Sequence, residues 1–405
     1  GTTISSGTLK LGTVSVGTVS SITSGALGTG SVTVADGAVL DVNGKLALNA
    51  MTLNGTGINA GGALINSDVS NAITLSNTVT LATNSAVGGA GNLTISGIIS
   101  GAGKVLTKVD TGTLTLGGSN TYSGGTTING GTLNITNNSG LGATTGAVTV
   151  ANGATLDLQS VTVGANPMTL AGGTLKDATS SFAGAITLTA DSTISVTNTA
   201  DTFTLSGVIS GVGYGVTIGG SGTIAFTGAN TYSGTTTINS GSTLNLSGSG
   251  SIANSAVSNT GTFSISGTSS GASVVNLTGA GSTVLGAKTL TISNANGTYS
   301  GVMSGTGGLT LTAGTLTLGG ANTYTGATTI NGGTLTVNGS LSDSTSVAVA
   351  SGATYALGAH DTITALTGSG AVNLNSYTLT LGNATGTYSG VMSGTGGLTL
   401  TAGTL

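Results

Sequence analysis

Hydrophobic and hydroxyl-bearing residues alternate along most of this chain in short runs. Leucines at 114 and 116 alternate with threonines at 113 and 115, and runs 309–312 and 148–150 repeat the pattern. A period of two places alternate side chains on opposite faces of a β-strand. The runs are three to six residues long and end in Gly-Gly, Asn-Gly, Ser-Gly or Asp-Gly, which accept the backbone angles of tight corners. The pattern predicts many short strands, each with one apolar face.

The chain also repeats itself. Residues 297–316 and 386–405 are the same twenty letters, GTYSGVMSGTGGLTLTAGTL, at an offset of 89. Looser copies share the motif S-G-hydrophobic-hydrophobic-S-G, which starts at Ser96, Ser206, Ser300 and Ser389. A second block recurs at 114–133, 224–244 and 316–335, and a third begins at 32, 148 and 347. The unequal spacing between copies indicates a coiling chain that tolerates insertions, and argues against cross-β stacking of identical segments.

A short strand with one apolar face cannot bury that face alone. A chain that coils and stacks each turn on the last closes a continuous core. With about 22 residues per turn the chain makes roughly 18 turns, spaced by about 4.8 Å. We therefore predict an all-β parallel β-solenoid that runs as a single body over residues 1–405. Its loose repeat units are 96–205, 206–299, 300–388 and a truncated 389–405, preceded by a more divergent repeat at 1–95.

The clearest copy of the repeat, LTKVDTGTLTLGGSNTYSGGTTINGGTL, spans residues 106–133. This segment resembles the autotransporter-associated β-strand repeat of bacterial autotransporter passenger domains and related surface proteins. The resemblance covers three full blocks and several fragments. It implies that the solenoid is right-handed, and that the protein is exported to the bacterial cell surface or beyond.

Composition narrows the fold and the range of partners. Glycine fills 75 of 405 positions, and the chain contains neither glutamate nor arginine, so long helices are excluded. Hydrophobic residues make up 37% of the chain, which argues against disorder. Only 4% of residues are charged and the net charge is −4, so no basic stripe is available for nucleic acid. No apolar run reaches the roughly 18 residues of a transmembrane helix.

The recurring residues at the corners are asparagine and tyrosine. One reading is ligand binding, with asparagines contacting sugar hydroxyls and tyrosines forming a stacking platform. The reading we favour is structural: asparagine tolerates left-handed backbone angles and can bond between stacked turns, while tyrosine fills the core with its hydroxyl reaching a partner. The repeated positions are Asn120, Tyr122, Asn129, Asn230, Tyr232, Asn239, Asn322, Tyr324 and Asn331.

The acidic residues suggest a search for metal or catalytic sites. Asp41 and Asp157 occupy equivalent places in the third block, but Ala356 replaces them in its third copy, so we interpret them as isolated, solvated carboxylates. The calcium-binding nonapeptide G-G-x-G-x-D is absent. His360 and Asp361 are adjacent, so in a strand they point to opposite faces and cannot act together. We expect no catalytic residue, no metal and no cofactor.

We expect a non-enzymatic, extracellular structural solenoid: a segment of a bacterial surface stalk or of a self-assembling filament. The alternative is an adhesin passenger that binds surface glycans or neighbouring cells. The expected partner is the protein itself, because residues 1–9 align with 125–133 and Leu405 aligns with Leu316, inside the repeat block. We therefore expect the array to continue at both ends, covalently or by stacking of copies.

Overall fold

The computed structural model describes residues 1–405 and confirms the predicted fold class. Parallel sheets form a β-solenoid of about 19 turns, close to the expected number. The helix content is one three-residue 3₁₀ segment, Ile58–Ala60. No helix in the structure is long and apolar enough to span a bilayer. The chain divides into two compact units, residues 1–197 with 201–208, and residues 198–200 with 209–405. The repeat-unit boundaries proposed above stay predictions.

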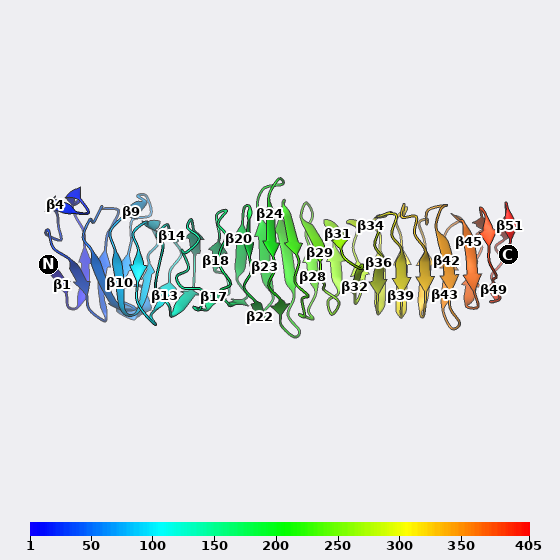
Figure 1. Cartoon of the computed structure of the whole chain (residues 1–405), viewed down its shortest axis with the longest axis horizontal. Helices are drawn as coiled ribbons and strands as arrows, with labels where there is room; N and C mark the ends of the chain where they lie inside the picture. Colours follow the sequence, from blue (N-terminus) through cyan, green and yellow to red (C-terminus); the bar gives the residue numbers. More distant parts are fainter. The chain divides into compact units, whose positions relative to one another are not determined.

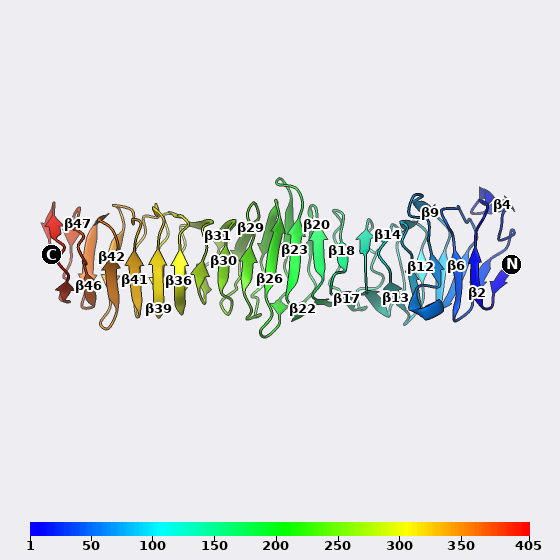
Figure 2. The same ribbon diagram turned by 180° about the vertical axis from the view of Figure 1, so that it is seen from behind.

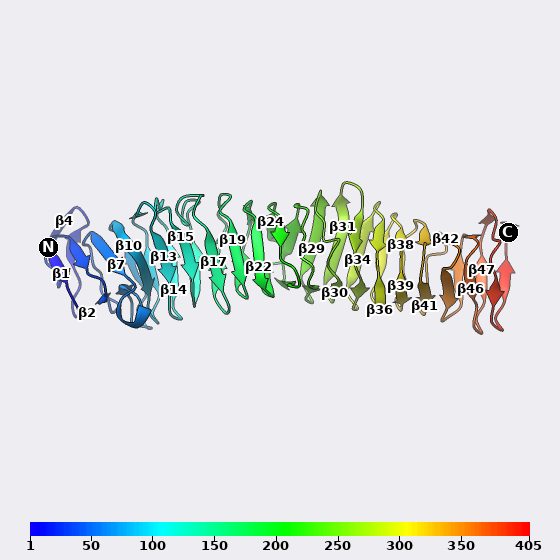
Figure 3. The ribbon, with the colours of Figure 1, turned by 90° about the horizontal axis from the view of Figure 1, so that it is seen from below.

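The first unit contains two long parallel sheets whose strands follow one another in chain order, as Figure 3 shows for β13, β15, β17 and β19. Along the first sheet lie β1 (Thr2–Ile4), β5 (Val32–Val34), β7 (Met51–Gly55), β10 (Val79–Gly88), β13 (Val105–Lys108), β15 (Gly125–Ile128), β17 (Val148–Ala151), β19 (Met168–Ala171) and β22 (Ile186–Ala190), with β2 (Gly7–Lys10), β6 (Ala38–Asp41), β8 (Leu64–Ile65) and β12 (Ile99–Ser100) branching from it. The second has β9 (Ile73–Leu75), β11 (Leu93–Ile95), β14 (Thr113–Leu116), β16 (Thr132–Ile135), β18 (Thr155–Asp157), β20 (Thr174–Asp177) and β23 (Ser192–Val196). A further pair is β21 (Ser180–Phe182) with β24 (Thr202–Leu205).

The second unit repeats this arrangement with more sheets, and Figure 2 shows β36, β39 and β41 side by side. Two sheets contain β26 (Val216–Gly220), β28 (Thr236–Ile238), β30 (Val257–Asn259) and β33 (Leu277–Thr278), and β27 (Thr223–Phe226), β29 (Thr243–Gly248), β31 (Thr262–Thr268), β34 (Ser282–Gly286) and β37 (Met303–Gly305). Two more contain β32 (Ala272–Val274), β35 (Leu290–Ile292), β38 (Leu309–Leu311), β40 (Thr328–Ile330), β42 (Ser346–Val349) and β45 (Ala365–Gly368), and β36 (Ala295–Tyr299), β39 (Gly314–Leu318), β41 (Thr334–Val337), β43 (Thr354–Leu357), β46 (Ala371–Asn373) and β49 (Met392–Ser393). The remaining strands are β25 (Ile209–Ser210), β44 (Asp361–Ile363), β47 (Leu379–Leu381), β50 (Leu398–Leu400), β48 (Ala384–Thr385) and β51 (Gly403–Thr404).

The parallel register stacks like residues on one another. In the second sheet of the first unit, each inward aliphatic residue lies directly on that of the next turn. This column is Leu93, Leu114, Leu133, Leu156, Leu175 and Ile194. All six side chains are buried. Their neighbours in sequence point outward, so the alternation in the sequence becomes a continuous core with a hydroxyl-rich exterior.

The glycine of the S-G-hydrophobic-hydrophobic-S-G motif is required by close approach of neighbouring turns. A Cβ atom at Gly97 would overlap the backbone carbonyl oxygen of Asn77, and one at Gly301 would overlap that of Gly281. Gly207 and Gly390 meet carbonyl oxygens in the same way. The motif therefore marks a corner where only a residue without a side chain allows the turns to stack.

One element departs from the parallel pattern. Strands β3 (Val16–Thr18) and β4 (Ser21–Ser24) form an antiparallel hairpin, near the N-terminus in Figure 1. Val14, Val16 and Val19 on this segment are exposed. The repeat analysis did not anticipate this hairpin, because its alternation of valine with serine and threonine is the same as that of the core strands.

Candidate functional site

The first asparagine of each corner connects neighbouring turns. The Asn120 Oδ1 atom accepts a hydrogen bond from the backbone N–H of Ile99 at 2.8 Å, and its Nδ2 donates to the Gly140 carbonyl at 2.7 Å. Asn230 Oδ1 accepts from the backbone N–H of Ile209 at 2.8 Å. Asn322 lies in the same arrangement, with Oδ1 accepting from Met303 N–H at 3.0 Å. Because all three asparagines are buried, their amides are not available to a ligand.

The corner tyrosines lie inside the solenoid. Tyr122, Tyr232 and Tyr324 are fully buried, and each hydroxyl lies 2.6–2.7 Å from the hydroxyl of the threonine four positions later. Burial raises the pKa of all three hydroxyls above the usual value, with the threonine bond acting in the opposite direction. These rings fill the core and cannot form a stacking platform for sugars.

The second asparagine of each corner lies on the surface. Asn129, Asn239 and Asn331 are exposed. Their backbone N–H groups donate to carbonyls of the preceding turn at 2.8–3.1 Å. None of the six repeated asparagines has a positive φ angle, so the expected tolerance of left-handed geometry is not what places them there. The two sets of asparagines do not come together in one site.

The expectation that Asp41 and Asp157 are solvated is wrong. Both are 3% exposed. The parallel register stacks Asp157 on Lys176, whose Nζ lies 2.8 Å from the carboxylate, and stacks Lys10 on Asp41 at 3.7 Å. Asp41 also accepts hydrogen bonds from Ser67, through N–H at 3.0 Å and Oγ at 2.6 Å. These carboxylates therefore bind neighbouring turns together.

Two further carboxylates are buried. Asp177 accepts from the Ser180 hydroxyl at 2.6 Å, and burial raises its pKa. Asp361 accepts from the Tyr355 hydroxyl at 2.8 Å and from the Leu341 N–H at 3.1 Å, and burial raises its pKa to about 6 in spite of these bonds.

The adjacent His360 lies on the surface. Its ring packs edge-on against Tyr377, with the centroids 5.6 Å apart. Asp361 is buried on the other side of the chain. The two side chains point apart, as the alternation of a strand requires. They do not form an acid–base pair.

Lys108 is a buried cation that the sequence did not reveal. Its Nζ donates to the backbone carbonyls of Val109 at 2.7 Å, Asp110 at 2.8 Å and Gly130 at 3.1 Å. Burial lowers the pKa of the amine to about 8, while the charge of Asp110 opposes this shift. The ammonium group fills a corner where three carbonyls converge, which is a structural use of its charge. No group of three His, Cys, Asp or Glu side chains is placed to hold a metal ion.

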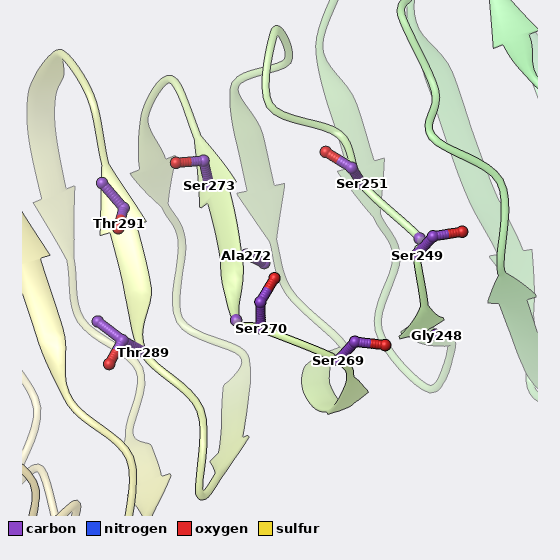
Figure 4. Close-up of a pocket in the computed structure, with 11 residues that line it drawn as sticks. Gly248, Ser249, Ser251, Ser269, Ser270, Ala272, Ser273, Thr289 and Thr291 are labelled. Atoms are coloured by element: carbon purple, nitrogen blue, oxygen red, sulfur yellow. The ribbon is translucent and has the colours of Figure 1, made fainter.

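The largest hollow is a groove of about 490 Å³ in the second unit, shown in Figure 4. Two glycine- and serine-rich loops, 248–251 and 269–271, line it together with β32 and the start of β35. Ser251 and Ser270 point into the space between the first loop and β32 (Figure 4). No charged or aromatic residue lines the groove. We refer to it below as the serine groove.

Comparison with known proteins agrees with the repeat analysis. The family model described as passenger-associated-transport-repeat matches residues 106–135, 219–246 and 313–337. Neither the curated proteins nor the solved structures contain a match to the chain. The three segments include the Asn-Thr-Tyr corners whose geometry is given above. The chain thus carries three passenger-associated-transport repeats, and its resemblance to the repeats of autotransporter passengers is confirmed.

Proposed function

We propose that this chain is structural material of a bacterial surface stalk or extracellular filament, and that its copies associate through their end turns. The passenger repeats support a surface or secreted location. The proposal includes no catalytic role and no cofactor: the buried carboxylates Asp41, Asp157 and Asp361 each bind a neighbouring part of the solenoid, and the chain has no arginine to stabilise a developing charge.

The observation that carries the proposal is one sequence in two environments. In the first copy of the twenty-residue segment, β38 lies between β35 and β40, and Leu309 and Leu311 are 0% exposed. In the second copy, β50 pairs with β47 alone. The equivalent leucines, Leu398 and Leu400, are 39% and 46% exposed. The same residues that form core in the first copy therefore offer an apolar face and a free strand edge in the second.

Strand β1 has the sequence that would cover this face. It reads Thr-Thr-Ile, like β40, and pairs with β5 on one edge only. In the register of β38 with β40, Leu398 would lie opposite Thr2 and Leu400 opposite Ile4 of a second copy. Covering the exposed part of each leucine contributes roughly 1 kcal/mol, in addition to the backbone hydrogen bonds of a new strand pair.

Sedimentation and electron microscopy of the purified 405-residue chain test this proposal. We expect oligomers or filaments, and we expect Leu400→Asp to prevent their formation because it places a charge in the apolar contact. Thr399→Asp is the matched control, since the neighbouring side chain points outward and should leave assembly intact. A monodisperse 37.9 kDa species without filaments would contradict the proposal. Isolated particles that bind cells would instead favour the adhesin role.

A further inference from the structure

The serine groove borders a free strand edge. Strand β32 is the first strand of its sheet, and it pairs with β35 on one side only. On its other side lies the loop 248–251, which forms an isolated bridge with Ala229 and does not pair with β32. The hollow seen in Figure 4 between this loop and β32 is therefore a place in the stack that has no strand.

The backbone groups of β32 show which way the free edge points. Ala272 donates its N–H to the Thr289 carbonyl at 3.1 Å, and Val274 accepts from the Ser293 N–H at 2.9 Å. Both residues therefore use their backbone groups toward β35. Because successive residues of a strand alternate between its two edges, the N–H and C=O of Ser273 point toward the groove. Such a donor and acceptor pair is a template for another strand.

The lining defines what the groove can hold. Its side chains are small and neutral, mostly serine and threonine, so a charged peptide would lose hydration there without gaining an ionic partner. It offers no aromatic face on which a sugar ring could stack. An extended backbone meets these conditions, because its own N–H and C=O groups pair with Ser273 while its small side chains lie among the hydroxyls.

We propose that the serine groove binds an extended, uncharged peptide of small residues, which adds as a strand beside β32. Main-chain hydrogen bonds at the edge provide affinity, and the narrow hydroxyl lining selects residues such as glycine, alanine, serine and threonine. The contact covers the length of a three-residue strand, about 10 Å. This site is on the side of the second unit and does not depend on association through the end turns.

Fluorescence polarisation with a labelled, blocked peptide, Gly-Ser-Thr-Ala-Thr-Ser-Gly, tests the proposal on the full chain. Two further peptides have N-methyl groups on alternate residues, one on the even positions and the other on the odd. A strand pairs through one edge, so we expect one methylated peptide to bind at least tenfold more weakly and the other to keep its affinity. Equal binding of both, or no binding of the parent peptide at about 1 mM, would overturn the proposal.

Variants of the protein locate the site. Ser270→Lys and Ser251→Lys place long charged side chains in the groove and should each weaken binding at least tenfold. Ser240→Lys changes an exposed serine outside the groove, so it adds the same charge and should leave binding unchanged. Equal loss in all three variants would show non-specific binding. Retention by the control of binding to an uncharged oligosaccharide, but not to the peptide, would assign the groove to glycans and refute strand addition.

Discussion

Replacing Asp361 by asparagine should stabilise the second unit at neutral pH. The carboxylate is buried, with a pKa raised to about 6 from the usual 3.8. The Tyr355 hydroxyl and the Leu341 N–H favour the charged form, but removal of the carboxylate from water outweighs them. Asparagine retains an acceptor for the Leu341 N–H and carries no charge, so it avoids the unfavourable burial of an ionised group.

The magnitude follows from the shift in pKa. The folded state binds this proton more tightly than the unfolded chain does, so its contribution to stability is fully present below pH 3.8 and is lost as pH rises through 6. A shift of about two units corresponds to about 3 kcal/mol. We therefore expect Asp361→Asn to unfold at a higher denaturant concentration than the wild type at pH 7.5, and the difference to shrink toward zero near pH 4.

Guanidinium unfolding followed by circular dichroism at pH 4, 5.5 and 7.5 measures this difference. Asp343→Asn is the matched control, because this exposed carboxylate lies close enough to raise the pKa of Asp361 slightly but is not itself buried. Its midpoint should follow that of the wild type at all three pH values. If Asp361→Asn unfolded earlier than the wild type by the same amount at every pH, the ionised carboxylate would be net stabilising and the reasoning would be wrong.

Three further outcomes follow from the packing of the turns. Gly301→Ala should lower stability by about 1–3 kcal/mol in chemical unfolding, because its Cβ meets a backbone carbonyl, whereas Gly382→Ala, with ordinary contacts, should change little. Tyr232→Phe should cost about 1 kcal/mol by removing a buried hydroxyl bond, and an unchanged midpoint would count against that bond. Lys108 should resist acetylation of the native protein in peptide mass spectrometry while the exposed Lys10 reacts; equal labelling would mean that the buried ammonium site opens readily.

The sequence was sufficient for the fold because the information that defines a solenoid is local and repeated. Alternation in runs such as Thr113–Leu116 predicted a strand with the observed faces, and the motif copies predicted stacking. The buried tyrosines also followed from their isolated positions between polar neighbours. The expected length of a turn, about 22 residues, was slightly too long on average, which is why the structure has about 19 turns.

The polar contacts between turns could not be derived in this way, because the length of each turn varies. Leu114 lies on Leu133, nineteen positions later, whereas Leu133 lies on Leu156, twenty-three positions later. An average period therefore does not identify Lys176 as the partner of Asp157. The serine groove was hidden for a related reason: the loop 248–251 has the same composition as the strands, and only the three-dimensional register shows that no strand pairs with β32 there.

The stacking of turns also determines how each unit responds to mechanical load. Within a unit, the hydrogen bonds that join one turn to the next run along the direction of stacking, perpendicular to the strands. Tension between the first and last turns would load these bonds in series, and a terminal turn could detach while the others stay folded. Each detached turn of about twenty residues releases roughly 70 Å of chain. A material built from such units would extend in many small, reversible steps and dissipate energy in each, without breaking at a single point.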